Sequence, residues 1–223
     1  MHFAVIVFPG SNCDHDAYHV FRHILDVPVD FVWHRETDLK KYDAIIIPGG
    51  FSYGDYLRTG AIARFSPVME SVIKEAHAGK PVFGICNGFQ ILIESELLPG
   101  ALIINQNVRF VSQDVTLKID STNSIYTRSL QKVRKLTMPI AHKQGNFIAD
   151  ENTFKMLEDE DRIAFRYSKG RKGNPNGSTN RIAGILNKKR NVLGMMPHPE
   201  RAVESILGSD DGIDIFKSMI GVA

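Results

Sequence analysis

The chain has 223 residues, of which 43% are hydrophobic and 23% are charged, and its formal net charge is +2. Such a composition is typical of a folded protein with a large core and excludes a disordered or collagen-like chain. The small net charge gives no electrostatic reason to expect a nucleic-acid partner, and no apolar run approaches the roughly 20 residues that span a bilayer. We therefore expect one domain over residues 1–223 that binds neither nucleic acid nor membrane.

Apolar runs and helical spacing alternate along the first half of the chain. Buried strands are predicted at residues 3–8, 29–33, 44–47 and 82–85, and helices from Asp14 onward, over about 62–78 and from Gly88 onward. Short strands separated by helices imply a doubly wound, mostly parallel sheet, whose ligands bind beyond the carboxyl ends of the strands. Three turns, Pro9-Gly10, Pro48-Gly49-Gly50 and Cys86, follow such strands, so we expect them to converge on one crevice.

The second half of the chain is richer in strands with alternating polarity. These are predicted at residues 108–119, 132–140, 163–167, 182–186 and 192–196. The turn cluster Gly173-Asn174-Pro175-Asn176-Gly177 separates two of them, as in antiparallel hairpins. The fold class expected for the whole chain is therefore α/β, with helices flanking a mostly parallel central sheet that has an antiparallel extension.

The segment Gly84-Ile85-Cys86-Asn87-Gly88 places a cysteine where a predicted strand turns into a predicted helix. A nucleophile at such a turn has a strained backbone, and flanking glycines avoid side-chain clashes. The first N–H groups of the helix carry partial positive charge, which favours a thiolate. The alternative is that Cys86 is a small buried hydrophobic residue, as free cysteines often are.

A second candidate segment is Met196-Pro197-His198-Pro199-Glu200-Arg201. Prolines on both sides of His198 restrict its backbone, and in an extended segment His198 and Glu200 project to the same side. A carboxylate beside an imidazole fixes its tautomer and stabilises the imidazolium, which suits the base of a thiol enzyme. The alternative is a charged surface loop.

Other histidines and the second cysteine are weaker candidates. His15, His19 and His23 recur every four residues, but three histidines along one helical stripe span about 12 Å, too far for one ion. We expect a polar helix face there and no metal site. Cys13 follows Ser11-Asn12 and is predicted to cap a helix rather than take part in chemistry. The two cysteines are the only ones, and no secretory leader precedes the first strand, so we expect a cytoplasmic protein with reduced thiols.

Together these motifs resemble the class I (triad) glutamine amidotransferases, which have a flavodoxin-like fold. Finer features resemble the glutaminase subunits of phosphoribosylformylglycinamidine synthases, which serve the fourth step of purine biosynthesis. These features are Phe8-Pro9-Gly10-Ser11-Asn12-Cys13-Asp14, Gly49-Gly50-Phe51-Ser52-Tyr53-Gly54-Asp55-Tyr56-Leu57-Arg58, Asn174-Pro175-Asn176-Gly177-Ser178 and Met195-Met196-Pro197-His198-Pro199-Glu200-Arg201. The resemblance covers nearly the whole chain. It departs at Gln144, where many relatives have glutamate.

The resemblance implies a residue-level mechanism. Cys86 would attack the side-chain amide of glutamine, His198 would donate a proton to the leaving ammonia, and Glu200 would orient His198. The backbone N–H groups of Gly50 and Asn87 would form the oxyanion hole. Residues expected in the glutamine pocket are Gly49, Gln90 and His142.

The resemblance also implies partners. The chain would need no cofactor of its own, and a synthetase subunit would use ATP and magnesium and receive the ammonia. A small third subunit would complete the complex.

Two other classes stay open on the sequence alone. One is a thiol hydrolase or stress protein with a flavodoxin-like fold, although many of these have histidine where this chain has Asn87. The other is a non-catalytic scaffold, which would not need Cys86, His198 and Glu200 together.

Overall fold

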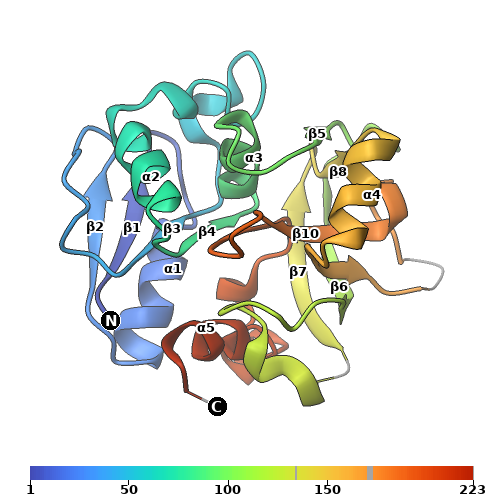
Figure 1. Cartoon of the computed structure of the whole chain (residues 1–223). Coiled ribbons are helices and arrows are strands. Elements are labelled where there is room, and N and C mark those ends of the chain that lie inside the picture. Colours follow the sequence, from blue (N-terminus) through green and yellow to red (C-terminus); the bar gives the residue numbers. More distant parts are fainter. Residues whose placement is uncertain (134, 170–172, 223) are drawn as a thin grey trace.

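The computed structural model describes residues 1–133, 135–169 and 173–222. Its main feature is a nine-stranded mixed sheet with the strand order β2-β1-β3-β4-β11-β10-β9-β6-β7 (Figure 1). The strands are β1 (Phe3–Val7), β2 (Val29–Trp33), β3 (Ala44–Ile47), β4 (Val82–Ile85), β6 (Val111–Ile119), β7 (Leu136–His142), β9 (Ile163–Tyr167), β10 (Ile182–Leu186) and β11 (Val192–Met195). A separate two-stranded sheet pairs β5 (Ala101–Ile103) with β8 (Asn146–Ile148).

The sheet is parallel in one half and antiparallel in the other. Strands β2, β1, β3, β4 and β11 run parallel to one another, whereas β10, β9, β6 and β7 continue the sheet through antiparallel pairs. The expected fold class is confirmed. The parallel strands β1, β3, β4 and β11 are almost continuously buried, as expected where helices cover both faces of a sheet, whereas the edge strand β2 exposes Phe31 and Trp33.

Helices cover both faces of the parallel half (Figure 1). They are α1 (Asp14–His19), which continues as a π-helix (Val20–Ile24), α2 (Pro67–His77), α3 (Asn87–Glu94) and α5 (Ile213–Ile220). The helix α4 (Glu151–Asp159) lies beside the antiparallel half (Figure 1). Helices α2 and α3 lie on one face, and α1 and α5 on the other. On the second face Phe3 of β1 stacks on Phe21, and Phe216 of α5 packs against Phe21 and Phe83. Short 3-10 helices cover Ser52–Asp55, Ala63–Phe65, Arg128–Lys132, Thr179–Arg181, Pro199–Arg201 and Ser205–Leu207.

Some predicted boundaries differ from the structure. The helix expected over 62–78 is broken at Ser66, which is extended (φ −64°, ψ 141°) because it precedes Pro67. The strand predicted over 108–119 begins only at Val111, since Val108 has a positive φ of 59°. In the strand predicted over 132–140, a 3-10 helix occupies residues up to Lys132, and residue 134 lies outside the described residues.

The strand β4 and the helix α3 pack at very short range. A Cβ placed on Gly88 would lie 1.9 Å from the carbonyl oxygen of Ile47, and one on Gly84 would lie 2.7 Å from the Gly88 backbone. These glycines therefore allow α3 to contact β3 and β4 directly, in addition to relieving the turn between them. None of the helices in the described ranges is long and apolar enough to cross a membrane.

Candidate active site

The segments that carry the predicted site residues meet at the carboxyl ends of the central parallel strands β3, β4 and β11. In the parallel register Ile85 pairs with Met195, and Gly84 pairs with Ile47. The residues that follow these strands therefore emerge side by side. This confirms the expected convergence of the Pro48-Gly49-Gly50 turn with Cys86, and it adds the His198 segment.

Cys86 occupies the turn between β4 and α3 in a strained conformation. Its φ and ψ are 51° and −103°, a region that L-residues seldom adopt. Its backbone N–H donates to the Met195 carbonyl (2.8 Å), and its thiol is 3.8 Å from the Ala141 carbonyl oxygen. The surrounding structure thus holds the thiol at the amino end of α3, as predicted from the glycine spacing.

His198 and Glu200 form a buried pair just after β11. The Nδ1 atom of His198 lies 2.6 Å from Glu200 Oε1, and each residue is only 2% exposed. A carboxylate can only accept, so Nδ1 carries the proton in this contact. The predicted extended conformation is wrong, because Pro199–Arg201 forms a 3-10 turn with His198 as its N-cap residue. That turn still brings the carboxylate to the imidazole.

The charge balance of the pair favours an imidazolium. Burial alone lowers the pKa of His198, but attraction to the Glu200 carboxylate, followed by the interactions with the sulfur atoms of Cys86 and Cys13, outweighs it and holds the pKa well above the usual 6.5. Among the described residues, His198 Nε2 and Glu200 Oε2 have no hydrogen-bond partner. The free Nε2 is the atom that would exchange protons with a reacting group.

Gly49 leaves the space in which these side chains meet. A Cβ at this position would lie 2.8 Å from His198 Cε1, 3.2 Å from Cys13 Sγ and 3.4 Å from Cys86 Cβ. Its role is therefore steric, and it brings the imidazole and both thiols close together.

The predicted oxyanion-hole residues flank Cys86. Asn87 is the first residue of α3, where a backbone N–H has no acceptor inside the helix. Its side chain is fixed on both sides, because Oδ1 accepts from the Ser52 N–H (3.1 Å) and Nδ2 donates to Gln90 Oε1 (2.9 Å). Gly50 has a φ of 135° and bridges to Ser11.

Two small cavities adjoin at Cys86. One, of about 210 Å³, is lined by Cys13, His198 and Arg201, and the other, of about 230 Å³, by Asp55, Gln90 and Gln144. Residues that line both are Gly50, Phe51, Cys86, Phe110 and Ala141. Cys86 therefore borders both cavities.

The predicted substrate-binding residues differ in whether their polar side-chain atoms already have hydrogen-bond partners in the protein. Gln90 donates to the Gln144 carbonyl oxygen (2.6 Å), and the Gln144 side chain accepts from the Thr59 hydroxyl (2.8 Å). His142 is buried, and burial followed by repulsion from His198 lowers its pKa to about 4. It is therefore neutral at pH 7, and its Nε2 has no partner among the described residues.

This arrangement agrees with the comparisons with known proteins. Residues 1–211 match the CobB/CobQ-like glutamine amidotransferase domain. The chain belongs to this family. It is 42% identical to a chain of the structure of PurLQS from Thermotoga maritima, with 99% of this chain and 97% of that chain covered and a TM-score of 0.89. The match decides against the rival family of flavodoxin-like thiol hydrolases.

More distant structures share the fold alone. A putative GMP synthase component from Thermoplasma acidophilum is 20% identical, with 99% and 93% of the two chains covered and a TM-score of 0.65. The glutaminase domain of CTPS from Trypanosoma brucei, with bound acivicin, is 15% identical, with 100% and 95% covered and a TM-score of 0.64.

The prediction that Cys13 caps a helix is only partly confirmed by the structure of this amidotransferase domain. It is the N-cap residue of α1, as predicted, but its side chain makes no capping hydrogen bond. Instead its sulfur accepts from Arg201 Nη2 (3.2 Å) and lines the cavity beside His198. Burial raises the pKa of this thiol, while His198 and Arg201 act in the opposite direction. Ligand atoms of Cys13, His198 and Glu200 lie within 4.8 Å of one another, but the Arg201 guanidinium on the sulfur opposes a cation there.

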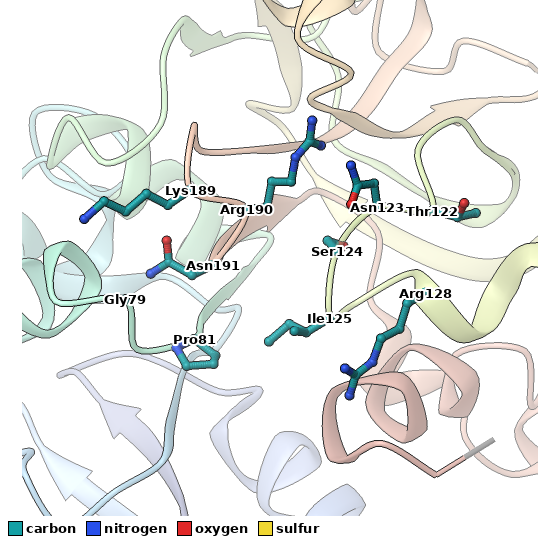
Figure 2. A pocket seen from close by; sticks show the side chains of 10 residues that line it. All are labelled: Gly79, Pro81, Thr122, Asn123, Ser124, Ile125, Arg128, Lys189, Arg190 and Asn191. Carbon is teal, nitrogen blue, oxygen red and sulfur yellow. The ribbon is translucent and has the colours of Figure 1, made fainter.

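Another cavity of the amidotransferase domain lies at the amino ends of β4 and β11, away from Cys86. It has a volume of about 360 Å³, and Arg128, Lys189 and Arg190 are among its lining residues (Figure 2). These side chains point away from one another, and each donates to a backbone carbonyl: Arg128 to Ser218, Lys189 to His77, and Arg190 to Glu160 and Asp161. Their charges do not converge on the cavity, so it is a poor anion site.

Proposed function

We propose that this chain is a glutaminase and that Cys86, His198 and Glu200 are its catalytic residues. The observation that carries the proposal is the buried His198–Glu200 pair, with its free Nε2 beside a thiol in a strained strand-to-helix turn. A scaffold without activity has no need of a buried, unsatisfied imidazole, which costs stability.

The proposed chemistry proceeds in two steps. The Cys86 thiolate attacks the side-chain amide carbon of glutamine, and the N–H groups of Gly50 and Asn87 stabilise the negative charge on the oxygen. The His198 imidazolium then gives its proton to the leaving nitrogen, ammonia departs, and a glutamyl thioester remains. Water, deprotonated by the now neutral His198, hydrolyses the thioester to glutamate and releases the Cys86 thiolate beside the restored imidazolium. In this scheme Gly49, Gln90 and His142 line the substrate pocket.

We further propose that the ammonia passes to a synthetase subunit of phosphoribosylformylglycinamidine synthase. Ammonia is mostly protonated at neutral pH and is then a poor nucleophile, so a partner must receive it before it reaches bulk water. In this proposal the partner converts formylglycinamide ribonucleotide with ATP and magnesium, a small third subunit completes the complex, and the assembly is cytoplasmic. The motif resemblance and the 42% identity to PurLQS over nearly the whole chain support this assignment. We propose a single glutaminase domain over residues 1–223.

The proposal is tested by supplying nitrogen in two forms. The chain is combined with the synthetase and the small subunit, and formylglycinamidine ribonucleotide is measured with glutamine or with ammonium salt. We expect Cys86→Ser to abolish the glutamine-dependent reaction and to preserve the ammonium-dependent one. If Cys86→Ser loses both reactions equally, or loses neither of them, the proposal is contradicted.

A second measurement concerns the dependence on the partner. Hydrolysis of glutamine by an unregulated chain would waste the substrate, so we expect the isolated chain to turn over glutamine slowly. Comparable turnover with and without the synthetase would overturn this expectation.

A further inference from the structure

Asp55 is a carboxylate that lines the cavity next to Cys86 and has an unused oxygen. Its Oδ1 atom is buried, and none of the described residues donates a hydrogen bond to it. Burial raises the pKa of Asp55 to about 6, with no compensating positive charge. An unsatisfied buried oxygen of this kind costs free energy and calls for a ligand or a structural reason.

The local backbone gives no such structural reason. Tyr53, Gly54 and Asp55 are all left-handed, with φ values of 53°, 67° and 55°. Aspartate tolerates this conformation when its side chain bonds the nearby backbone, but Asp55 Oδ1 makes no such bond.

Neighbouring segments hold this strained turn on both sides. The Ser52 N–H donates to Asn87 Oδ1 (3.1 Å), and the Tyr53 N–H donates to the Pro9 carbonyl (2.6 Å). The Tyr53 hydroxyl also bonds to His34 and Ser66, at 2.8 and 2.7 Å. Strain of this kind persists only where surrounding contacts enforce it, and it is concentrated at functional sites.

The cavity has the charges that complement an amino acid. It is lined by one carboxylate, Asp55, and by one ammonium group, Lys143, which do not form an ion pair with each other, while His142 is neutral. The head group of free glutamine has one ammonium and one carboxylate, three carbon–carbon bonds from the amide carbon that Cys86 would attack.

We propose that Asp55 binds the α-ammonium group of glutamine and thereby restricts the enzyme to the free amino acid. This inference rests on the proposed glutaminase function and adds the group that recognises the substrate head. Asp55 is a binding residue in this account, because it takes no part in proton transfer at the amide. The ammonium supplies the donor that Asp55 Oδ1 lacks.

The test compares glutamine with glutaramate, the amide that has hydrogen in place of the α-ammonium group. The wild type and Asp55→Asn are each assembled with the partner subunits, and kcat and KM are measured for both substrates. Asparagine is chosen because it tolerates the left-handed backbone. We expect KM for glutamine to rise about 10- to 100-fold with a smaller change in kcat, and the preference for glutamine over glutaramate to be lost. Asp26→Asn is the matched control, since Asp26 is also left-handed (φ 50°) but has a fully accessible side chain (94%).

Thermal stability separates a binding role from a structural one. If Asp55 exists to bind substrate, Asp55→Asn removes the charge of a half-buried carboxylate. The ligand-free variant should then have a higher Tm than the wild type above pH 6 and the same Tm below pH 4. A wild-type enzyme that hydrolyses glutamine while Asp55→Asn keeps the wild-type preference overturns this inference and leaves the proposed function intact. If Asp55→Asn has a lower Tm than the wild type at every pH and loses activity equally toward both substrates, Asp55 has a structural role, and the inference is also overturned. A wild-type enzyme that hydrolyses no glutamine overturns the proposed function itself.

Discussion

His198 Nδ1 is 2.6 Å from Glu200 Oε1, and this contact links the two residues on which the proposed acid–base chemistry depends. Both side chains are buried, so the attraction between an imidazolium and a carboxylate is weakly screened. The pair keeps the pKa of His198 raised and leaves Nε2 available to the reacting group.

Replacing Glu200 with glutamine keeps the shape of this contact and removes its charge. The pKa of His198 then falls, and the ring loses the group that fixes its tautomer. We expect kcat/KM for glutamine to fall about 10²- to 10⁴-fold, with KM nearly unchanged, in steady-state assays of the assembled enzyme. A loss that appears mainly in KM would instead mark Glu200 as a binding residue.

The same pair predicts a pH-dependent stability. Because the folded-state pKa of His198 lies above its unfolded value of about 6.5, the stabilisation is complete below pH 6.5 and is lost as the pH rises through the folded-state pKa. The difference in unfolding free energy between wild type and Glu200→Gln should therefore be largest near pH 6 and shrink toward pH 10. Denaturant unfolding across this range measures it, and a difference that grows with pH would contradict the assignment.

Adding one methyl group at Gly49 should disrupt the site with little effect on the core. The new Cβ would lie 2.8 Å from His198 Cε1, so the imidazole must move. Small misplacements of catalytic groups cost about 10²-fold in rate, and we expect a loss of that order in kcat for Gly49→Ala.

Gly208→Ala is the control for this substitution. A Cβ at Gly208 meets nothing within 4 Å, but its φ of 108° makes alanine strained, so stability should fall while turnover is retained. Equal turnover for Gly49→Ala and wild type would contradict the steric role of Gly49.

Cys13 should be far less important for turnover than Cys86, although both thiols lie beside His198. Its backbone is unstrained (φ −109°, ψ 9°), and burial raises its pKa, which favours the neutral thiol. We expect Cys13→Ser to change kcat/KM by less than about tenfold, a loss of no more than about 1.4 kcal/mol. A loss as large as that of Cys86→Ser would exchange the roles of the two cysteines.

Tyr126 should affect stability without affecting chemistry. Its buried hydroxyl lies 2.9 Å from the carbonyl oxygen of Val82 and 2.6 Å from that of Asn191, at the ends of β4 and β11 opposite the site, and its single proton is shared between these two acceptors. Tyr126→Phe leaves these contacts unmade, and we expect about 1–3 kcal/mol lower unfolding free energy with kcat/KM unchanged. Tyr18→Phe is the control, because Tyr18 stacks on Phe31 and its hydroxyl has no partner among the described residues.

The sequence predicts the strands of the parallel half almost to the residue. Residues 29–33, 44–47 and 82–85 were expected as strands and are β2, β3 and β4, because a short, mainly apolar run with a proline on one side has few alternatives. Helices α4 and α5 were not predicted, although Asp150 caps α4 and Gly221 ends α5 in a left-handed conformation. The signals that identify a helix were therefore present at both.

The site was predictable only where chemistry and turn geometry coincide in one segment. Cys86 and His198 are each marked by neighbouring glycines or prolines, so local sequence points to them. Cys13 and Asp55 have ordinary local explanations, as a helix cap and a loop acid. Their place beside Cys86 depends on which loops meet at the sheet edge, which single-sequence patterns do not show.

The central claim is that Cys86 is the nucleophile that attacks glutamine. It is tested most directly by treating the protein, alone and with the synthetase, with the glutamine-analogue electrophile diazo-oxo-norleucine and locating the adduct by peptide mass spectrometry. We predict one adduct per chain, on Cys86, formed more slowly in the presence of glutamine, while the neighbouring Cys13 stays unmodified. No adduct even with the synthetase present, or an adduct on Cys13 instead, would contradict the claim.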